Sequence, residues 1–177
     1  SAGFTHWAKL NNLKQAAKTM NFLTEHGISS YGELESKLTV VSARRDTAHA
    51  EIKRIESRSA ELTLVMKHAG TYRQLKPIYD RYRKSNDKEK FLRGHESEII
   101  LFEAAARELK RLRAVPLPTT ESMKTELANL NAEKERLLAE YKAARTEAQE
   151  YDTVKQNVDA LMAVPKEQEQ QRRHELE

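Results

Sequence analysis

Histidine and acidic side chains are the groups that could carry catalysis or hold a metal ion in this chain. None of its six histidines belongs to an H-x-H, H-x-x-x-H or H-E-x-x-H motif, whose spacing brings two imidazoles to one metal ion. They are His6, His26, His49, His68, His95 and His174. His95 with Glu96 or Glu98 resembles part of a Glu-x-x-His carboxylate site, but in reversed order and on a single element. We therefore expect His95 to pack at a helix seam.

Other reactive groups are also missing from the sequence. The chain has no cysteine, which excludes disulfides, thiolate zinc sites and cysteine nucleophiles, and we find no nucleophile beside a suitable base. The five glycines are scattered and form neither a G-x-G-x-x-G nor a G-x-x-x-x-G-K phosphate loop. No apolar run approaches the length of a membrane span. These observations predict a cytoplasmic, non-enzymatic protein with no catalytic residue, no metal, no cofactor and no membrane insertion.

A run of basic side chains between residues 67 and 93 is the best candidate for a binding site. It contains nine basic residues against three acidic ones. The basic residues are Lys67, Arg73, Lys76, Arg81, Arg83, Lys84, Lys88, Lys90 and Arg93. Tyr72, Tyr79, Tyr82 and Phe91 are interleaved with them. Lysine and arginine neutralise phosphates and aromatic rings stack on unpaired bases, so we predict a nucleic-acid site here that includes Tyr82.

A second interpretation of this run is that it is a solvated helix face. The tyrosines lie at helical spacing, so at least two would then belong to a hairpin core. The charge is also unevenly spread, since residues 1–113 hold 22 basic and 14 acidic side chains and residues 114–177 hold 9 and 13. A basic first part followed by an acidic last helix favours an anionic partner for the first part.

The elements that must position these residues are helices. One third of the residues are charged and 6% are aromatic, which leaves too few apolar residues for a β-sandwich. The first helix is predicted over residues 4–25, with a stripe at Trp7, Leu10, Leu13, Ala17, Met20 and Leu23 and with Trp7 anchoring it to the bundle. Gly27 supplies its C-cap, and Ser30 with Glu33 has the spacing of a capping box that begins the next helix.

Two long heptad seams follow. The first predicts a helix from residue 30 that passes Gly70, is kinked at Pro77 and ends before residue 85. Its seam residues are Leu34, Leu38, Val41, Ala48, Ile52, Ile55, Ser59, Leu62, Met66 and Ala69. The second seam belongs to a helix that Thr119 or Thr120 caps and Pro165 ends. Its seam residues are Met123, Leu127, Leu130, Leu137, Tyr141, Ala144, Ala148, Tyr151, Val158 and Met162.

Between the two seams we predict a further helix over residues 88–113, capped by Asn86 and folding back on the first long helix. The expected fold is therefore all-α, an elongated bundle of about four helices with long antiparallel coiled-coil hairpins. Its segments are an N-terminal helix (1–29), a long hairpin with a basic tip (30–113), a proline linker (114–119), a second coiled-coil helix (120–164) and a charged tail (165–177). The two long helices should pair antiparallel within one chain, and self-association as a homodimer stays open as an alternative.

Several short motifs resemble a known family. Residues 7–28 read W-A-K, N-L-K-Q, A-K-T and N-F-L-x-E-H-G, and Y-x-E-L-E follows. Y-D-R-Y-R-K at 79–84, K-F-L at 90–92 and L-P-T at 117–119 continue the likeness. Together they resemble the region after the nuclease domain of relaxases, the mobilisation nucleases of conjugative and integrative elements of Gram-positive bacteria. The resemblance covers roughly residues 4 to 162.

The resemblance implies a role in DNA mobilisation. A relaxase nicks one strand with a tyrosine and a metal held by an H-x-H type motif in its N-terminal domain. This chain has no such histidine pair, so no tyrosine here inherits the nucleophile's role, and the chain resembles a C-terminal helical region. Such a region implies contact with transfer-origin DNA through its backbone, or with a relaxosome accessory protein or the type IV coupling protein. The alternative is a structural coiled-coil or dimerisation module without a nucleic-acid role.

Overall fold

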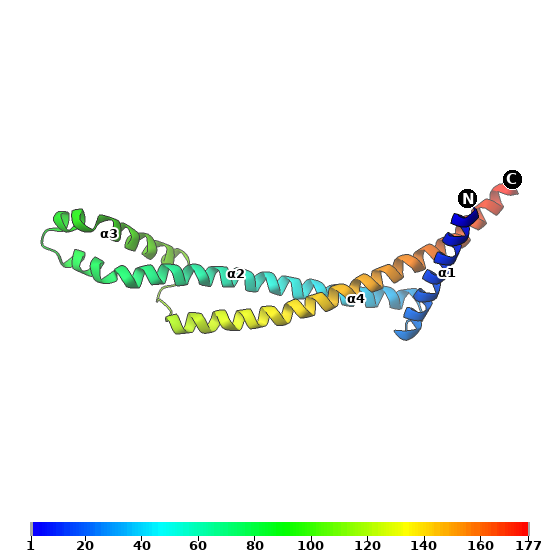
Figure 1. Ribbon diagram of the computed structural model, residues 1–177, viewed down its shortest axis with the longest axis horizontal. Coiled ribbons are helices and arrows are strands. Elements are labelled where there is room, and N and C mark those ends of the chain that lie inside the picture. Colours follow the sequence, from blue (N-terminus) through cyan, green and yellow to red (C-terminus); the bar gives the residue numbers. More distant parts are fainter. Residues whose placement is uncertain (1, 177) are drawn as a thin grey trace. The chain divides into compact units, whose positions relative to one another are not determined.

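The computed structural model describes residues 2–176, and it describes no side chain at position 4 or at positions 164–168. The described part of the chain contains four helices and no strand (Figure 1). They are α1 (Ala2–Glu25), α2 (Tyr31–Lys84), α3 (Lys88–Arg111) and α4 (Thr120–Glu175). The prediction of an all-α fold built on two long helices is confirmed. The chain forms two compact units, Ser1–His49 with Leu138–Glu177, and Ala50–Leu137.

Local sequence signals set the ends of the helices. After α1, Gly27 adopts a φ of 63°, and the backbone N–H of Ile28 donates to the carbonyl of Leu23 at 2.8 Å, as in a Schellman cap. At the start of α2 the Glu33 N–H donates to Ser30 Oγ at 3.2 Å, whereas the Glu33 carboxylate accepts from Ser29 rather than closing the predicted box on Ser30. Thr119 caps α4 by accepting from the Ser122 N–H at 3.1 Å.

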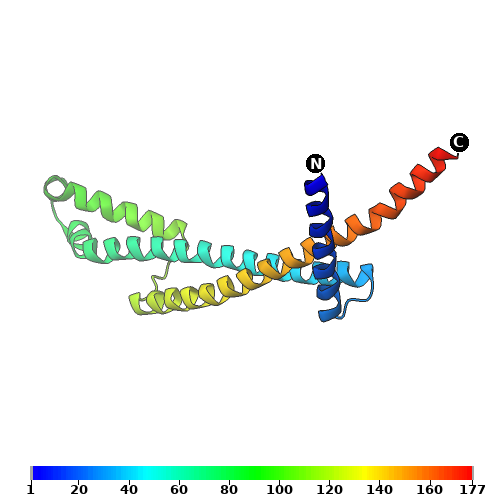
Figure 2. The same ribbon diagram turned by 45° about the vertical axis from the view of Figure 1, so that its right-hand side comes forward.

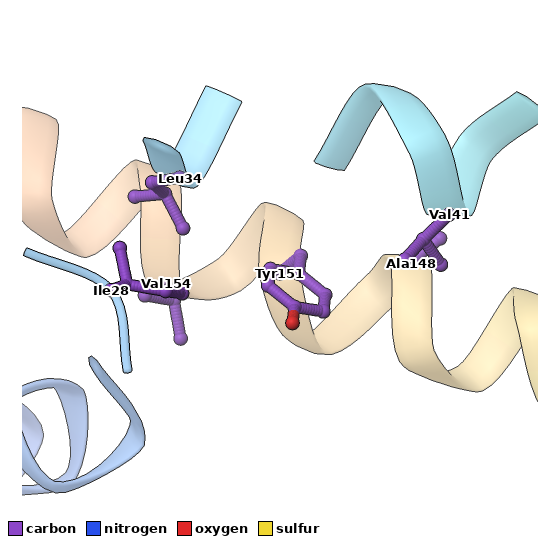
Figure 3. Packing of buried hydrophobic residues seen from close by; sticks show 6 residues of the cluster. All are labelled: Ile28, Leu34, Val41, Ala148, Tyr151 and Val154. Atoms are coloured by element: carbon purple, nitrogen blue, oxygen red, sulfur yellow. The ribbon is translucent and has the colours of Figure 1, made fainter. Parts of the chain in front are cut away.

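In the first unit, α2 and α4 run antiparallel, as predicted. Tyr31 donates to Asp159 at 2.7 Å, and Arg44 pairs with Glu147 at 3.1 Å. Residues with higher numbers in α2 thus contact residues with lower numbers in α4. A buried cluster lies between the helices and includes the loop before α2 (Figure 3). Its members are Ile28, Leu34, Val41, Ala148, Tyr151 and Val154. Phe22 and Leu23 of α1 pack against it, which ties α1 to the pair.

The second unit contains the later part of α2, all of α3 and the first part of α4. Ile55, Leu62 and Val65 of α2 are buried there with Ile99, Phe102 and Leu109 of α3 and with Met123 and Leu130 of α4. Across the antiparallel pair, Arg58 donates two hydrogen bonds to the Glu126 carboxylate, at 2.6 and 3.1 Å. Lys134 pairs with Glu56 at 3.3 Å, and Glu56 also pairs with Lys53 at 3.3 Å, so its carboxylate is shared by two cations.

The predicted stripe of α1 is wrong except at Leu23, which is half-buried and packs against the cluster. Its other residues face solvent, with Trp7 62% exposed, Leu13 66% and Met20 57%, so Trp7 is not the buried anchor that was predicted. The face that packs on α4 carries Thr19, which is 2% exposed and accepts a hydrogen bond from Asn157 Nδ2 at 3.3 Å. Figure 2 shows α1 crossing the C-terminal half of α4. A short side chain at the crossing allows close approach, which the larger stripe residues would prevent.

The predicted end at Pro165 is also wrong, because α4 continues to Glu175 and includes most of the segment predicted as a tail. A proline removes one helical hydrogen bond, but the residues that follow are mainly glutamate, glutamine and arginine, which favour helix. Similarly, α2 passes through Pro77 as one helix. Among the described residues, no helix combines the length and the apolar character needed to cross a membrane.

Candidate nucleic-acid interface

The predicted basic run lies at the turn between α2 and α3, where the two helices form a hairpin (Figure 1). Three residues make the turn, and Ser85 Oγ donates to the carbonyl of Asp87 at 3.1 Å. The N-cap of α3 is Asp87, whose carboxylate accepts from the backbone N–H of Lys90 at 3.1 Å. The prediction of Asn86 as cap is thus wrong by one position. An aspartate suits this place because its charge is favourable at the positive end of the helix dipole.

Two of the predicted site residues have structural partners. Arg73 donates to Thr120 Oγ1 at 3.0 Å and to the carbonyl of Pro118, so its guanidinium holds the start of α4 against α2. Lys76 pairs with Asp80 one turn further on at 3.0 Å. That hydrogen bond raises the pKa of Lys76 above its ordinary value. These two cations are therefore engaged within the protein.

Six other cations cluster around the turn, and we call them the tip cations. They are Arg81, Arg83, Lys84, Lys88, Lys90 and Arg93. All six are exposed, and within the described part of the chain none of their side chains forms an ion pair. The first three lie in the last turn of α2 and the others in the first two turns of α3. Lys67, the remaining predicted residue, is exposed but lies about 20 Å along α2 from the tip.

The acidic residues of the tip do not neutralise these cations. Asp80 pairs with Lys76, and Asp87 caps α3. Glu89 occupies the first turn of α3, where its negative charge interacts favourably with the positive end of the helix dipole. Lys88 and Lys90 lie in the same region and gain nothing from that dipole. The C-terminal end of the α2 dipole favours Arg81, Arg83 and Lys84, which lie in its last turn. The fold gives no such account of the three cations in the first two turns of α3, whereas an anionic ligand would account for all six.

The aromatic side chains of the run form a column inside the hairpin. Phe102 of α3 stacks on Tyr72 and Tyr79 of α2, with ring centroids 4.7 and 4.3 Å apart. Tyr82 continues the column, 6.0 Å from Tyr79 and 6.1 Å from Phe91. These rings are half-buried or buried. Tyr82, a predicted site residue, thus packs in the hairpin, and the column offers no free platform on which a base could stack.

A break in α3 helps to place the end of this column. His95 has a non-helical φ of −138° and ψ of 24°, and its ring stacks on Phe91 with centroids 4.5 Å apart. Its Nδ1 lies 3.3 Å from Glu98 Oε2. Both contacts lie within α3, so the packing of His95 at the seam between helices stays a prediction, and the break itself was not predicted. Gly94 is the one sequence signal for it, because glycine weakens a helix interior.

The tip is suited to bind an anion by charge. Among the described residues, no group of three or more His, Asp or Glu side chains could hold a metal ion. The exposed lysine and arginine side chains are long, so they can reach phosphates that are spaced along a backbone. Comparison of the chain with protein-family models, with curated proteins and with solved structures gives no match.

Proposed function

We propose that this chain is an accessory helical domain of a conjugative relaxase, and that it assists mobilisation by holding DNA at the tip cations. The proposal rests on a resemblance and on the charge of the tip. The motifs at residues 7–28, 79–84 and 90–92 resemble the helical region of that family. The last two of these segments also contain the tip cations Arg81, Arg83, Lys84 and Lys90.

The observation that carries the proposal is the unneutralised charge of the tip. Six exposed cations lie within about thirteen residues, while the three acidic residues nearby serve an ion pair, a helix cap and a first helical turn. Like charges at this density repel one another and weaken the compact state. A polyanion removes that repulsion and releases its own counterions, which is the main driving force of nonspecific DNA binding.

The proposed contact is with the phosphate backbone. Because the rings of the hairpin pack on one another, base stacking has no support. The tip also lacks the array of Arg, Asn and Gln along one helix that reads base edges in a groove. We therefore propose that the tip holds transfer-origin DNA without choosing its sequence. Selection of the origin would then depend on the nuclease domain or on a relaxosome accessory or coupling protein.

The alternative is a dimerisation module, in which the heptad seams would be the functional surface. The buried seam residues of α2 and α4 cover each other within one chain in each unit, as Leu34, Ile55, Met123 and Ala148 show by being at most 2% exposed. A second copy could use these seams only by displacing the partner helix. This arrangement favours the DNA proposal over a dimer made through the seams.

The proposal is tested by reversing four charges at the tip. A control variant has the same net charge but carries its four reversals elsewhere. One variant changes Arg81, Arg83, Lys88 and Lys90 to Glu, and the control changes four exposed cations elsewhere. The control residues are Arg107, Lys124, Lys142 and Arg145. Fluorescence anisotropy with a labelled duplex at low salt should show a loss of affinity of more than about tenfold in the first variant and a much smaller loss in the control. Equal losses in both variants would mean that binding follows net charge alone, and the tip assignment would fail.

A further inference from the structure

The outward face of α1 is a short coiled-coil seam, on which no other helix packs among the residues that the structure describes. Leu10 and Ala17 occupy a positions, and Leu13 and Met20 occupy d positions, of a seven-residue repeat. Leu10 is 46% exposed, Leu13 66% and Met20 57%. The opposite face of the same helix packs on α4 through Thr19 and Phe22. The helix is thus already held in place with its second apolar stripe facing solvent.

Lysines flank this seam where a coiled coil sets its choice of partner. Lys9 is at the g position before Leu10, and Lys14 is at the e position after Leu13. Both are exposed, and neither forms an ion pair within the part of the chain that the structure describes. The helix carries no acidic residue before Glu25, its last residue. The seam is therefore apolar along its centre and wholly basic at its charged flanks.

This charge pattern excludes a second copy as the favoured occupant. In a parallel pair of α1 helices, a g residue meets the e residue five positions later on the partner, so Lys9 would face Lys14 of the other copy. In an antiparallel pair, g positions meet g positions and e positions meet e positions, and neither set contains an acid. Either arrangement brings lysines together with no compensating carboxylate, which disfavours self-association through this face.

A partner helix with acidic residues at its e and g positions would attract the lysines of this seam instead of repelling them. We infer that α1 docks an amphipathic helix of another protein that has leucine-like residues at a and d and Glu or Asp at e and g. The apolar residues would enclose one another, and Lys9 and Lys14 would each gain a carboxylate. The stripe is narrow, with only Trp7 at an e position beside its a and d residues, which suits a helix better than the broad apolar face of an interfacial membrane helix. This inference does not depend on DNA binding at the tip.

The single tryptophan provides the readout. Trp7 lies at an e position beside the seam and is 62% exposed, so a docked helix should shift its emission to the blue. The probes are two synthetic three-heptad peptides without tryptophan, with leucine at a and d and either Glu or Lys at every e and g position. With the full chain, we expect the Glu peptide to bind about tenfold more tightly than the Lys peptide, because two lysines each exchange a repulsive for an attractive neighbour.

A charge-swapped variant makes the test specific. Lys9→Glu with Lys14→Glu should reverse the order of the two peptides, and Leu13→Glu should abolish binding of both. All three residues are exposed, so far-UV circular dichroism should not change. The inference is overturned if wild-type chain binds the two peptides within about twofold of each other. It is also overturned if Trp7 emission shifts with protein concentration alone, or with phosphatidylglycerol vesicles but not with the Glu peptide.

Discussion

Phe102 connects α3 to the aromatic column of the hairpin, and its removal is expected to have the largest effect on stability there. The side chain is 5% exposed and stacks on both Tyr72 and Tyr79, at centroid distances of 4.7 and 4.3 Å. The change Phe102→Ala deletes the ring and both of these contacts. It therefore tests whether the rings serve the fold, as their packing indicates, or are dispensable and available to a ligand.

The expected loss follows from burial and from the two ring pairs. Deleting a buried phenylalanine side chain lowers the free energy of unfolding by about 3–5 kcal/mol. A ring pair contributes about 0.5–1.5 kcal/mol beyond its buried area. Phe102→Leu keeps much of the apolar volume and loses both ring pairs, so it should cost about 1–3 kcal/mol. The free energy of unfolding of a typical protein is about 5–15 kcal/mol, so the alanine variant should be clearly destabilised.

Urea denaturation followed by far-UV circular dichroism measures these losses. Leu101→Ala is the matched control, because Leu101 is the adjacent residue of α3 and is 55% exposed, and it should cost less than about 1 kcal/mol. A double-mutant cycle between Phe102→Leu and Tyr79→Leu should give a coupling of about 0.5–1.5 kcal/mol. If Phe102→Ala costs no more than Leu101→Ala, the column does not stabilise the hairpin and this account of the aromatic residues is refuted.

Three further predictions concern helix ends. Gly27→Ala should cost about 1 kcal/mol by urea titration, since an added Cβ meets no atom within 4 Å but φ is +63°. Arg113→Gly should instead stabilise by about 0.5–1 kcal/mol, since Arg113 has a φ of 54° in the cap that follows α3, and an unchanged urea midpoint would contradict this. Hydrogen bonds from the backbone and hydroxyl of Ser29 lower the pKa of Glu33, so its contribution is present above its ordinary pKa of 4.5 and lost as pH falls through the lowered pKa. Glu33→Gln should therefore reduce Tm at neutral pH and much less in acid, and a loss that is equal at both pH values would refute the role given to its charge.

Heptad spacing was sufficient to predict the two long helices and their antiparallel pairing. It failed in detail where one helix meets two neighbours. Val65 is 4% exposed while the predicted Met66 is half-buried, because α2 there contacts α3 as well as α4. Periodicity was also misleading in α1, which has an apolar stripe on each side of its C-terminal half. The pattern of Leu10, Leu13 and Met20 is the more regular, but Thr19 permits the closer crossing, and single-sequence periodicity does not report which stripe finds a partner.

The candidate site was located by sequence but not resolved by it. Charge counting found the basic run at residues 67–93, and the predicted break between helices at residues 85–87 placed it at the end of a hairpin. Counting cannot show which cations are already engaged. Arg73 finds partners 45 and 47 positions away, at Pro118 and Thr120, and this contact depends on how α4 returns after the proline linker. The nine predicted cations become six tip cations because Arg73 makes this tertiary contact, Lys76 pairs with Asp80 within α2, and Lys67 lies too far along α2.

The salt dependence of DNA affinity tests the central claim most directly. Each phosphate contact with duplex DNA adds about −0.9 to the slope of log K against log[salt], so the six tip cations allow a slope of up to about −5. The wild-type chain is predicted to show a steep slope between about 50 and 200 mM salt, and the variant with Glu at positions 81, 83, 88 and 90 should have a slope no steeper than about −2. A wild-type slope near zero, or an equally steep slope in that variant, would contradict the account.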